Sequence, residues 1–363
     1  MLSTRPDLVP PRYEAALASL QDAAAPLPYA AIEESVRREL GCPPEQAFAS
    51  FSEAPIAAAS IGQVHAARLH DGSDVVIKVR RPGVTEVVEV DLAILRLAAE
   101  VISSLSRTVR RIDPVGFVEE FGKTIRAELD YLAEGDNADR MRERLHALGV
   151  HVPRVVWPCT TRAVLTLERI HGTKIDDVHA LCAAGVDRSK LARDFATAYL
   201  AMVFSFGFFH ADPHPGNLFV EAGGRIALVD FGMVGTVPPG IRRALAEILV
   251  ALVQRDASRS ARALHDLGVV PADVEELEFA RELERLTAAT IDVPIGGLRL
   301  APLLAQLMSV SRRHHLRLPR ELALLVKTVV MCEGIAAQID PAFSLAPVLA
   351  SFIGRSVQAN RAT

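Results

Sequence analysis

Four stretches of the chain combine dense apolar residues with a strand-forming composition. "GQVHAARL" (62–69) and "DVVIKV" (74–79) are joined across "HDGSD", and an Asp-Gly pair between two such runs is typical of a β-hairpin. "RAVLTLERIHG" (162–172) predicts a further strand that ends at a glycine. "NLFVEAGGRIALVDF" (217–231) predicts a second hairpin around a Gly-Gly pair.

Helical spacing fills most of the remaining chain. Residues 12–40 are Ala-rich and are broken at 27–29 by "PLP", so they predict two helices ahead of the main domain. The longest pattern runs from 114 to about 148, with apolar residues recurring every three or four positions. Beyond about residue 172 the pattern is almost wholly helical apart from the second hairpin. A strand-rich first part and a helix-rich second part predict an α+β, two-lobed fold.

Composition and charge narrow the class of protein. The 363 residues are 50% hydrophobic, which is enough for a sizeable core in two domains or one bilobal domain. The 40 basic and 44 acidic residues give a net charge of -4 and form no basic run, which argues against a nucleic-acid-binding surface. The four cysteines are far apart and form no zinc-binding or disulfide pattern, so we expect a reducing, cytoplasmic setting.

Two segments bear on membrane association. The chain opens without a continuous apolar stretch behind a basic start, so no signal peptide is predicted. The most apolar late segment (321–339) is interrupted by Lys327 and Glu333, which favours a buried core helix over a membrane span. We therefore expect a soluble protein that could still lie against a membrane.

Polar side chains bracket the second predicted hairpin. Asp212 and Asn217 lie before it in "HADPHPGNLFV" and Asp230 follows it, so pairing of the two strands would make these three oxygen-bearing side chains converge. Carboxylate and amide oxygens suit Mg²⁺, which usually takes one or two protein carboxylates and completes its shell with phosphate oxygens and water. Asp212 would then orient or deprotonate an attacking hydroxyl, which favours a phosphoryl-transfer site over a zinc site.

A second interpretation of the same residues is structural. "DPHPGN" is an ordinary Pro/Gly/Asn turn, and "DFG" can be a strand end with a capping Asp. His210 and His214 suggest a metal, but the prolines at 213 and 215 make the segment extended and favour structural roles for both histidines. The hairpin that links the two segments favours the functional interpretation over the turn.

Lys78 occupies an alternating position in a predicted strand with apolar neighbours. Its ammonium either reaches solvent at an edge or meets an anion. A phosphate-binding lysine also needs a helix carboxylate to hold it, and the predicted 114–148 helix supplies Glu128, Asp130 and Glu134. Asp130 and Glu134 lie on one helix face, although an exposed acidic face is the alternative.

The segment "APIAAASIGQVHAARL" lies one hairpin before the lysine, where a nucleotide-binding loop would be expected. Small side chains let a backbone approach phosphates closely, although Ala and Ser allow less conformational freedom than Gly. An Ala-rich stretch in an Ala-rich protein is weak support by itself.

Taken in order, "AAASIGQVHAARL", "VVIKVRRPGV", "ELDYLAEGDNADRM", "HADPHPGNLFV" and "LVDFG" resemble the UbiB/AarF-type atypical kinases of the protein-kinase-like superfamily. Segments near both ends share the resemblance, so it covers most of the chain. The resemblance implies a bilobal protein-kinase-like fold. Its parts would be an incomplete helical N-terminal extension (1–46), a small strand-rich N-lobe (47–172) and a larger helical C-lobe (173–363).

The resemblance also implies roles for individual residues. Lys78 would contact the α- and β-phosphates of ATP or ADP while paired with Glu134, and Asp212 would be the acid of the catalytic loop. Asn217 and Asp230 would be the magnesium ligands. The Ala-rich phosphate loop would consist of Ala57, Ala58, Ala59, Ser60, Ile61, Gly62 and Gln63. The adenine-binding hinge would include Glu168 and Ile170, and the family's ExD pair would be Glu128 and Asp130.

Two features of the family are missing from this sequence. Its Lys-x-Gly-Gln motif belongs immediately upstream of "MLSTRPD", and in the family that motif pairs with the ExD residues over the active site. The resemblance therefore implies a partner for Glu128 and Asp130 that lies upstream of the sequence given. Many relatives also carry a C-terminal hydrophobic membrane-anchoring hairpin, whereas this sequence stops at "SVQANRAT". We expect membrane contact to be peripheral or through a partner.

A short segment after "DFGMVG" bears on the substrate. A Pro-Pro-Gly breaker and a new helix follow within about ten residues, whereas protein kinases dock a peptide on a longer activation segment with an Ala-Pro-Glu anchor. This argues against a peptide substrate. We therefore expect an Mg²⁺-dependent atypical kinase or ATPase, a transferase acting with ATP, connected by resemblance to isoprenoid-quinone (ubiquinone) lipid metabolism.

Two other functions stay open. A nucleotide-gated scaffold that binds isoprenoid-quinone lipid or quinone-biosynthesis enzymes with little turnover would use the same residues. An antibiotic-type small-molecule phosphotransferase also uses a "H-x-D-x-H-x-G-N" loop, but the Ala-rich loop and the "ELDY" helix argue against it. We expect a nucleotide ligand, no nucleic-acid partner, and a cytoplasmic location that is at most peripheral at the inner face of the membrane.

Overall fold

The computed structural model describes residues 25–105, 113–253, 256–266, 281, 320–345, 347–349 and 351–352. Most of the first helix predicted within residues 12–40 lies outside these described residues.

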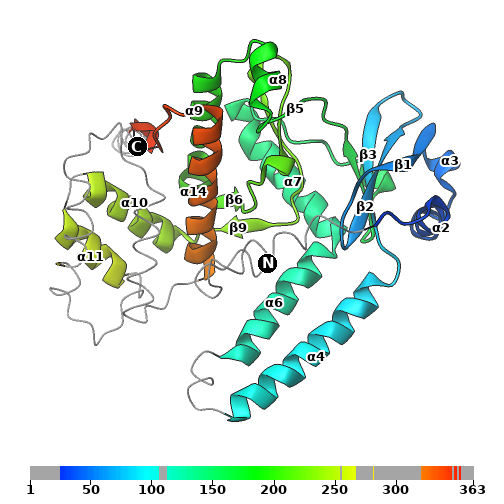
Figure 1. Ribbon diagram of the computed structural model, residues 1–363, viewed down its shortest axis with the longest axis horizontal. Helices are drawn as coiled ribbons and strands as arrows, with labels where there is room; N and C mark the ends of the chain where they lie inside the picture. The colour runs from blue at the N-terminus through cyan, green and yellow to red at the C-terminus, as the bar shows by residue number, and fades with distance from the viewer. Residues whose placement is uncertain are drawn as a thin grey trace. The chain divides into compact units, whose positions relative to one another are not determined.

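The chain forms two compact units, whose strands and helices are labelled in Figure 1. The segments of the first unit are Met1–Arg142, Pro153–Ile170 and Asp230–Gly232. The segments of the second unit are Glu143–Val152, His171–Val229 and Met233–Thr363.

A four-stranded antiparallel sheet forms the centre of the first unit. Its strands, in spatial order, are β1 (Ser50–Ala58), β2 (Gly62–Arg68), β3 (Asp74–Arg80) and β4 (Val164–Glu168). The hairpin predicted from "GQVHAARL" and "DVVIKV" is confirmed as β2 and β3, with Val64 paired to Lys78. The strand predicted from "RAVLTLERIHG" is confirmed as β4.

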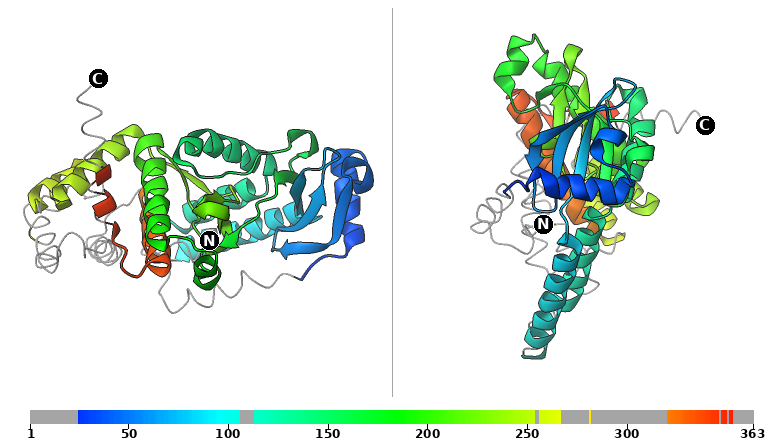
Figure 2. Two further views of the ribbon diagram at one scale, coloured as in Figure 1. Left: turned by 90° about the horizontal axis from the view of Figure 1, so that it is seen from above. Right: turned by 90° about the vertical axis from the view of Figure 1, so that its right-hand side faces the viewer.

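One face of this sheet packs against α2 (Tyr29–Leu40), and short α3 (Pro44–Ala47) leads from α2 to β1. Figure 2 shows α2 beside the sheet in both of its views. The buried core on this face comes from both elements: Val75, Ile77 and Val79 of β3, and Ile32 and Val36 of α2. Because successive side chains of a strand point to opposite faces, Lys78 points away from this core.

Strand β1 is not among the predicted elements. "SFSEAPIAA" lacks the β-branched residues and the alternation of β2 and β3. Its pairing with β2 shifts register between Phe51 and Pro55, and again between Pro55 and Ala57. Proline has no N–H to give to a strand ladder, so an irregular edge strand fits this sequence better than a central one.

Helices α4 (Val84–Leu105), α6 (Pro114–Glu128) and α7 (Tyr131–Leu145) complete the first unit. Figure 1 shows α4 and α6 running side by side, and Figure 2 shows the same pairing. The prediction of a single helix over 114–148 is wrong, because the helical structure is interrupted between α6 and α7. Asp130 lies at the break, where its Oδ1 accepts a hydrogen bond from Leu132 N at 3.1 Å and caps α7.

The second unit is mainly helical. Its helices are α8 (Val178–Ala183), α9 (Arg188–Leu200), α10 (Pro239–Val253), α11 (Ala257–Asp266) and α14 (Arg320–Ile339). Figure 1 shows α9 beside α14, and Ser189 Oγ at the start of α9 donates to Asp340 Oδ2 at 2.6 Å. Helix α14 confirms the buried helix predicted at 321–339. None of the helices among the described residues has the length and apolar character that a membrane crossing requires.

Five short strands accompany these helices: β5 (Thr173–Lys174), β6 (Phe208–His210), β7 (Leu218–Val220), β8 (Ile226–Leu228) and β9 (Val234–Thr236). They form two small sheets, ordered β5-β7-β8 and β6-β9. The predicted second hairpin is confirmed as β7 and β8, and the glycines at its turn both have a φ of 79°. The expectation that this hairpin alone interrupts the helices is wrong, since β5, β6 and β9 are too short to leave a periodic pattern. The α+β class is confirmed.

Ile77→Ala is expected to lower the free energy of unfolding by about 2–5 kcal/mol, because Ile77 is fully buried and truncation leaves a cavity under α2. Urea denaturation followed by circular dichroism measures the change. Val90→Ala on α4, where the side chain is 59% exposed, is the control and should stay within about 0.5 kcal/mol of the wild type. Similar losses in the two variants would contradict the core described above.

Candidate active site

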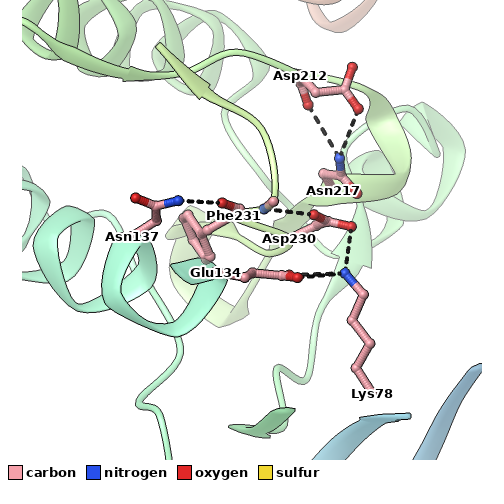
Figure 3. Close-up of polar contacts among 8 residues, drawn as sticks. Lys78, Glu134, Asn137, Asp212, Asn217, Asp230 and Phe231 are labelled. Atoms are coloured by element: carbon pink, nitrogen blue, oxygen red, sulfur yellow. Dashed lines mark hydrogen bonds and ion pairs between the residues drawn. The ribbon is translucent and has the colours of Figure 1, made fainter. Parts of the chain in front are cut away.

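A buried ion pair joins β3 to α7 in the first unit. Lys78 Nζ lies 3.0 Å from Glu134 Oε1 and 2.9 Å from Glu134 Oε2 (Figure 3). The Glu134 side chain is 2% exposed and the Lys78 side chain 19%. Of the three candidate carboxylates from the sequence, Glu134 is therefore the one that holds Lys78.

Asp230 places a second carboxylate on the same ammonium. Its Oδ2 lies 3.4 Å from Lys78 Nζ, and its Oδ1 accepts a hydrogen bond from Gly232 N at 3.2 Å. The φ of Asp230 is 64°, in the left-handed region where Asn and Asp are enriched among non-glycine residues. The side chain is 46% exposed, so this carboxylate contacts Lys78 and still faces solvent. Backbone outliers of this kind cluster at functional sites.

Burial and charge oppose each other in this cluster. Burial favours the neutral amine of Lys78, but the carboxylates of Asp230 and Glu134 outweigh it and raise the pKa of Lys78 above its ordinary value. Burial also raises the pKa of Glu134, while the Lys78 ammonium opposes that shift. Lys78 therefore stays protonated at neutral pH.

The same helix holds the segment that contains Asp230. Asn137 Nδ2 donates to Phe231 O at 3.1 Å, and the Phe231 side chain is fully buried. Glu134 and Asn137 are three residues apart on α7, so they lie on one face of the helix. Figure 3 shows Asn137 pointing from α7 toward Phe231 and Glu134 pointing from α7 toward Lys78. One helix face thus positions both the lysine and Asp230.

The Ala-rich segment lies at the turn between β1 and β2. Ala57 and Ala58 end β1, and Gly62 begins β2. Ala59 N donates to Gly62 O at 2.8 Å across the turn. Between them, Ser60 and Ile61 complete a turn that carries only one large side chain.

Gln63 follows this turn, but its side chain points into the protein. It is fully buried, and its Oε1 accepts a hydrogen bond from Leu27 N at 2.8 Å. Its Nε2 lies 3.1 Å from His65 Nε2. The amide therefore links the chain before α2 to β2, and any nucleotide contact predicted for Gln63 would have to come from its backbone.

Tyr131 fills the space behind Gly62. A Cβ at Gly62 would overlap the Tyr131 hydroxyl and would lie 3.1 Å from Val79 O. The Tyr131 side chain is fully buried, and Lys78 Nζ lies 5.1 Å from its ring centroid, within the range of a cation–π interaction. Among the described residues its hydroxyl has no hydrogen-bond partner. Sequence reasoning missed Tyr131, although it directly follows the ExD pair.

The ExD pair is divided by the break between the two helices. Glu128 is the last residue of α6, whereas Asp130 caps α7. At the predicted hinge, Glu168 ends β4 and its Oε2 accepts a hydrogen bond from Arg154 N at 3.1 Å, while Ile170 is half-buried two residues further on. The roles of these four residues toward a nucleotide stay predictions.

The predicted catalytic loop follows β6 in the second unit. Asn217 Nδ2 lies 3.4 Å from Asp212 Oδ2 and 3.3 Å from Asp212 O (Figure 3). Both histidines bind the backbone of the loop: His210 Nδ1 accepts from Asp212 N at 3.3 Å, and His214 Nδ1 accepts from Gly216 N at 3.1 Å. In the described part of the chain, no three His, Cys, Asp or Glu side chains gather into a metal-binding group. The two hydrogen bonds tie both histidine rings to the backbone of the loop.

The β7–β8 hairpin runs from this loop to the residue before Asp230. β7 begins directly after Asn217, and Val229, just past β8, donates from its N to Asn217 O at 3.0 Å. Asp230 is the next residue in the chain. The sequence pattern thus identified correctly which backbone segments the hairpin pairs.

Lys327 of α14 also reaches the loop, and no motif pointed to it. Its Nζ lies 3.6 Å from Asp212 Oδ1, and its side chain is 13% exposed. Burial lowers the pKa of Lys327, while the Asp212 carboxylate opposes that shift. The signal in the sequence is a lysine inside the apolar run "LALLVKTVVM", which by itself only counts against a membrane span.

Protein kinases use a strand lysine paired with a helix glutamate, and the aspartate of a DFG segment, to hold a nucleotide and its metal. The fold and these residues together define a kinase-like protein. The chain belongs to the ABC1 atypical kinase-like family, since the family model described as "ABC1 atypical kinase-like domain" matches residues 19–264. A second model, "UbiB helical domain", matches residues 283–344. The resemblance to UbiB-type kinases is confirmed.

Two curated proteins are similar over nearly the whole chain. "Uncharacterized protein sll1770" of Synechocystis sp. (strain ATCC 27184 / PCC 6803 / Kazusa) is 36% identical over 354 residues. "Probable protein kinase UbiB" of Marinobacter nauticus (strain ATCC 700491 / DSM 11845 / VT8) is 35% identical over 350 residues. The matches cover 97% and 95% of this chain but 60% and 64% of the two relatives. This chain therefore spans less than two thirds of each relative's length.

One solved structure supports the fold. It is described as "The complex structure of Rv3197-erythromycin from Mycobacterium tuberculosis" and is 26% identical with a TM-score of 0.69. The match covers 93% of this chain and 86% of that chain. Together with the match to the kinase-like family model, this structure confirms the kinase-like fold expected from the sequence.

Gly62→Ala is expected to lower the free energy of unfolding by about 1–3 kcal/mol, because the added methyl group meets the buried Tyr131 hydroxyl. Tyr131→Phe removes that oxygen, so Gly62→Ala should cost distinctly less in the Tyr131→Phe background. Urea denaturation of the two single variants and the double variant gives the coupling. Strict additivity would show that the added methyl group does not meet the Tyr131 hydroxyl.

Proposed function

We propose that this chain binds ATP and ADP with Mg²⁺ and either hydrolyses ATP or transfers its γ-phosphoryl group to a small molecule. The observation that carries the proposal is the buried Lys78–Glu134 pair with Asp230 on the same ammonium. Kinases use such a fixed cation to place nucleotide phosphates, and their catalysis is mostly positioning and charge neutralisation. Membership of the ABC1 atypical kinase-like family supports this reaction class.

Lys78 would bind the α- and β-phosphates from the sheet face opposite the core. The β1–β2 turn would cover them, because its small side chains let backbone N–H groups come close to phosphate oxygens. Gly62 contributes to this by leaving room for Tyr131 behind it. Backbone groups between Glu168 and Ile170 would recognise the adenine ring.

Asn217 and Asp230 would hold the magnesium ion. Asp230 offers a half-exposed carboxylate. The Nδ2 of Asn217 is engaged with Asp212, so its Oδ1 is the atom suited to a cation. One carboxylate and one amide oxygen fit Mg²⁺, which takes few protein ligands and completes its shell with phosphate oxygens and water. When bound, the ion would neutralise charge on the β- and γ-phosphates.

Asp212 would act on the acceptor. Its carboxylate, 37% exposed, would orient the attacking hydroxyl or water and take its proton. The short segment after the DFG residues favours a small acceptor over a peptide. After Gly232 the chain enters β9 and then α10 at Pro239, which leaves no room for a peptide-docking activation segment.

The biological setting is also part of this proposal. The UbiB name of one relative supports a link to isoprenoid-quinone metabolism. The erythromycin complex of the solved neighbour supports a small organic ligand. We expect a cytoplasmic location with, at most, peripheral contact at the inner face of the membrane, where a quinone lipid or quinone-biosynthesis enzymes would be the partners.

Asp230→Asn is expected to abolish the thermal stabilisation by Mg·ATP and Mg·ADP. Asn tolerates the left-handed backbone at this position, so the loss would report the missing carboxylate rather than a strained turn. A nucleotide at 100 times its Kd stabilises the wild type by about 2.7 kcal/mol, which differential scanning fluorimetry resolves. Asp91→Asn on exposed α4 removes the same charge elsewhere and is the control. An unchanged melting shift in Asp230→Asn would rule out the metal assignment.

Single-turnover ATP hydrolysis separates the enzyme from the nucleotide-gated scaffold. The enzyme should convert bound ATP to ADP and phosphate, with or without quinone-like lipid present. Asp212→Asn should slow this step by roughly 10²–10⁴-fold while nucleotide binding persists, because Asp212 serves the acceptor. If the wild type binds Mg·ATP but hydrolyses none under either condition, the result favours the scaffold over the enzyme.

A further inference from the structure

Lys327 contacts the proposed catalytic acid from a helix far along the chain. Thr328, its neighbour on α14, is 1% exposed, and its hydroxyl lies 3.5 Å from Ala211 O, directly before Asp212. Helix α14 therefore packs on the backbone of the loop. Lys327 Nζ lies 3.6 Å from Asp212 Oδ1, while Asn217 Nδ2 lies 3.4 Å from Asp212 Oδ2. Each carboxylate oxygen of Asp212 thus faces its own nitrogen donor.

The loop itself contains no cationic side chain of the Lys or Arg type. Between Asp212 and Asn217 its sequence is Pro-His-Pro-Gly, and the histidine Nδ1 accepts a hydrogen bond from Gly216 N. A transferring phosphoryl group carries negative charge on its outer oxygens, and enzymes neutralise that charge with fixed donors and cations. In the second unit, Lys327 is a cation already in contact with the acid.

A purely structural role for Lys327 makes a different prediction. Partial burial of an ammonium has a desolvation cost, and a buried ion pair often adds little net stability compared with apolar side chains of similar size. If Lys327 only docked α14 on the loop, an apolar replacement would keep the reaction rate of the folded protein. If Lys327 serves the reaction, the rate falls even when the fold survives.

We infer that Lys327 orients the Asp212 carboxylate and neutralises negative charge on the transferring phosphoryl group. The inference rests on the proposed function, because it assigns a further residue to that site. As the acceptor oxygen bonds to the γ-phosphorus, Asp212 takes the acceptor proton. The bond from that phosphorus to the β–γ bridging oxygen breaks, and ADP leaves with the bonding electron pair. Lys327 then donates to the phosphoryl oxygens instead of to Asp212, whose charge the proton has cancelled.

The test measures steady-state phosphate release from Mg·ATP, with water as the acceptor. Lys327→Met is expected to lower kcat by roughly 10²-fold or more, with the KM for Mg·ATP within about threefold of the wild type. Lys327→Gln keeps a hydrogen-bond donor without the charge and should lose a similar factor. Lys327→Arg keeps the charge, so its kcat should be at least about tenfold higher than that of Lys327→Met. Lys190→Met, at a 66% exposed lysine of α9, is the matched control with wild-type rates.

Three outcomes would overturn the inference: a kcat of Lys327→Met near that of the wild type, equal losses in the Arg and Met variants, or a loss confined to KM. If Lys327→Met does not fold, the Gln and Arg variants decide the comparison. Failure of the proposed function is recognised separately. A wild type that binds no Mg·ATP ends both ideas. A wild type that binds Mg·ATP but releases no phosphate overturns only this inference, because transfer to a small-molecule acceptor would still fit the proposed function. A wild type that turns over and loses its Mg·ATP melting shift in Asp230→Asn, but is unaffected by Lys327→Met, also ends only this inference.

Discussion

The ammonium of Lys78 is mostly removed from water, and the two carboxylates of Glu134 and Asp230 compensate for its desolvation. Removing one partner of a buried ion pair typically lowers the free energy of unfolding by about 3–5 kcal/mol, because the remaining charge is buried without a compensating partner. One ammonium therefore couples segments that are distant in sequence, since 56 residues separate Lys78 from Glu134 and 152 separate it from Asp230. The sheet, α7 and the turn after β8 can be displaced from one another only by leaving one of these charges unpaired.

The parts of the fold that the sequence predicted are those with a dense local signal. The β2–β3 hairpin has an Asp-Gly turn between β-branched runs, and the β7–β8 hairpin has two glycines in the left-handed region. The break between α6 and α7 has no such signal, because apolar spacing continues across it and only the capping of Leu132 by Asp130 marks it. Strand β1 and the two- and three-residue strands depend on partners that lie elsewhere in the chain. Their pairing is a tertiary effect that no local window contains.

The residues of the candidate site also divide into those that a local sequence signal could identify and those that it could not. Residues in short motifs, such as Asp212 with Asn217, could be found because a loop fixes both at once. The partner of Lys78 was named as Glu134 only by the family resemblance, and the structure has that pair. The residue pattern alone left Glu128, Asp130 and Glu134 open, because the choice depends on where α7 begins. Tyr131 and Lys327 carry no motif. Tyr131 is recognised by its position in the space that Gly62 leaves open. Lys327 is recognised by its contact with Asp212, about 115 residues earlier, which only the packing of α14 creates.

The contact between α14 and the loop also has a consequence for the order in which the protein is made. Ribosomes add about 5–20 residues per second, and domains fold from the N-terminus as they emerge. Lys78, Glu134 and strand β4 all leave the ribosome before Asp212. Thr328 follows Ala211 by 117 residues, which at these rates is a delay on the order of ten seconds. A nascent chain could therefore assemble the lysine–glutamate pair while the loop around Asp212 still lacks α14, and Asp212 gains Lys327 only after α14 has emerged.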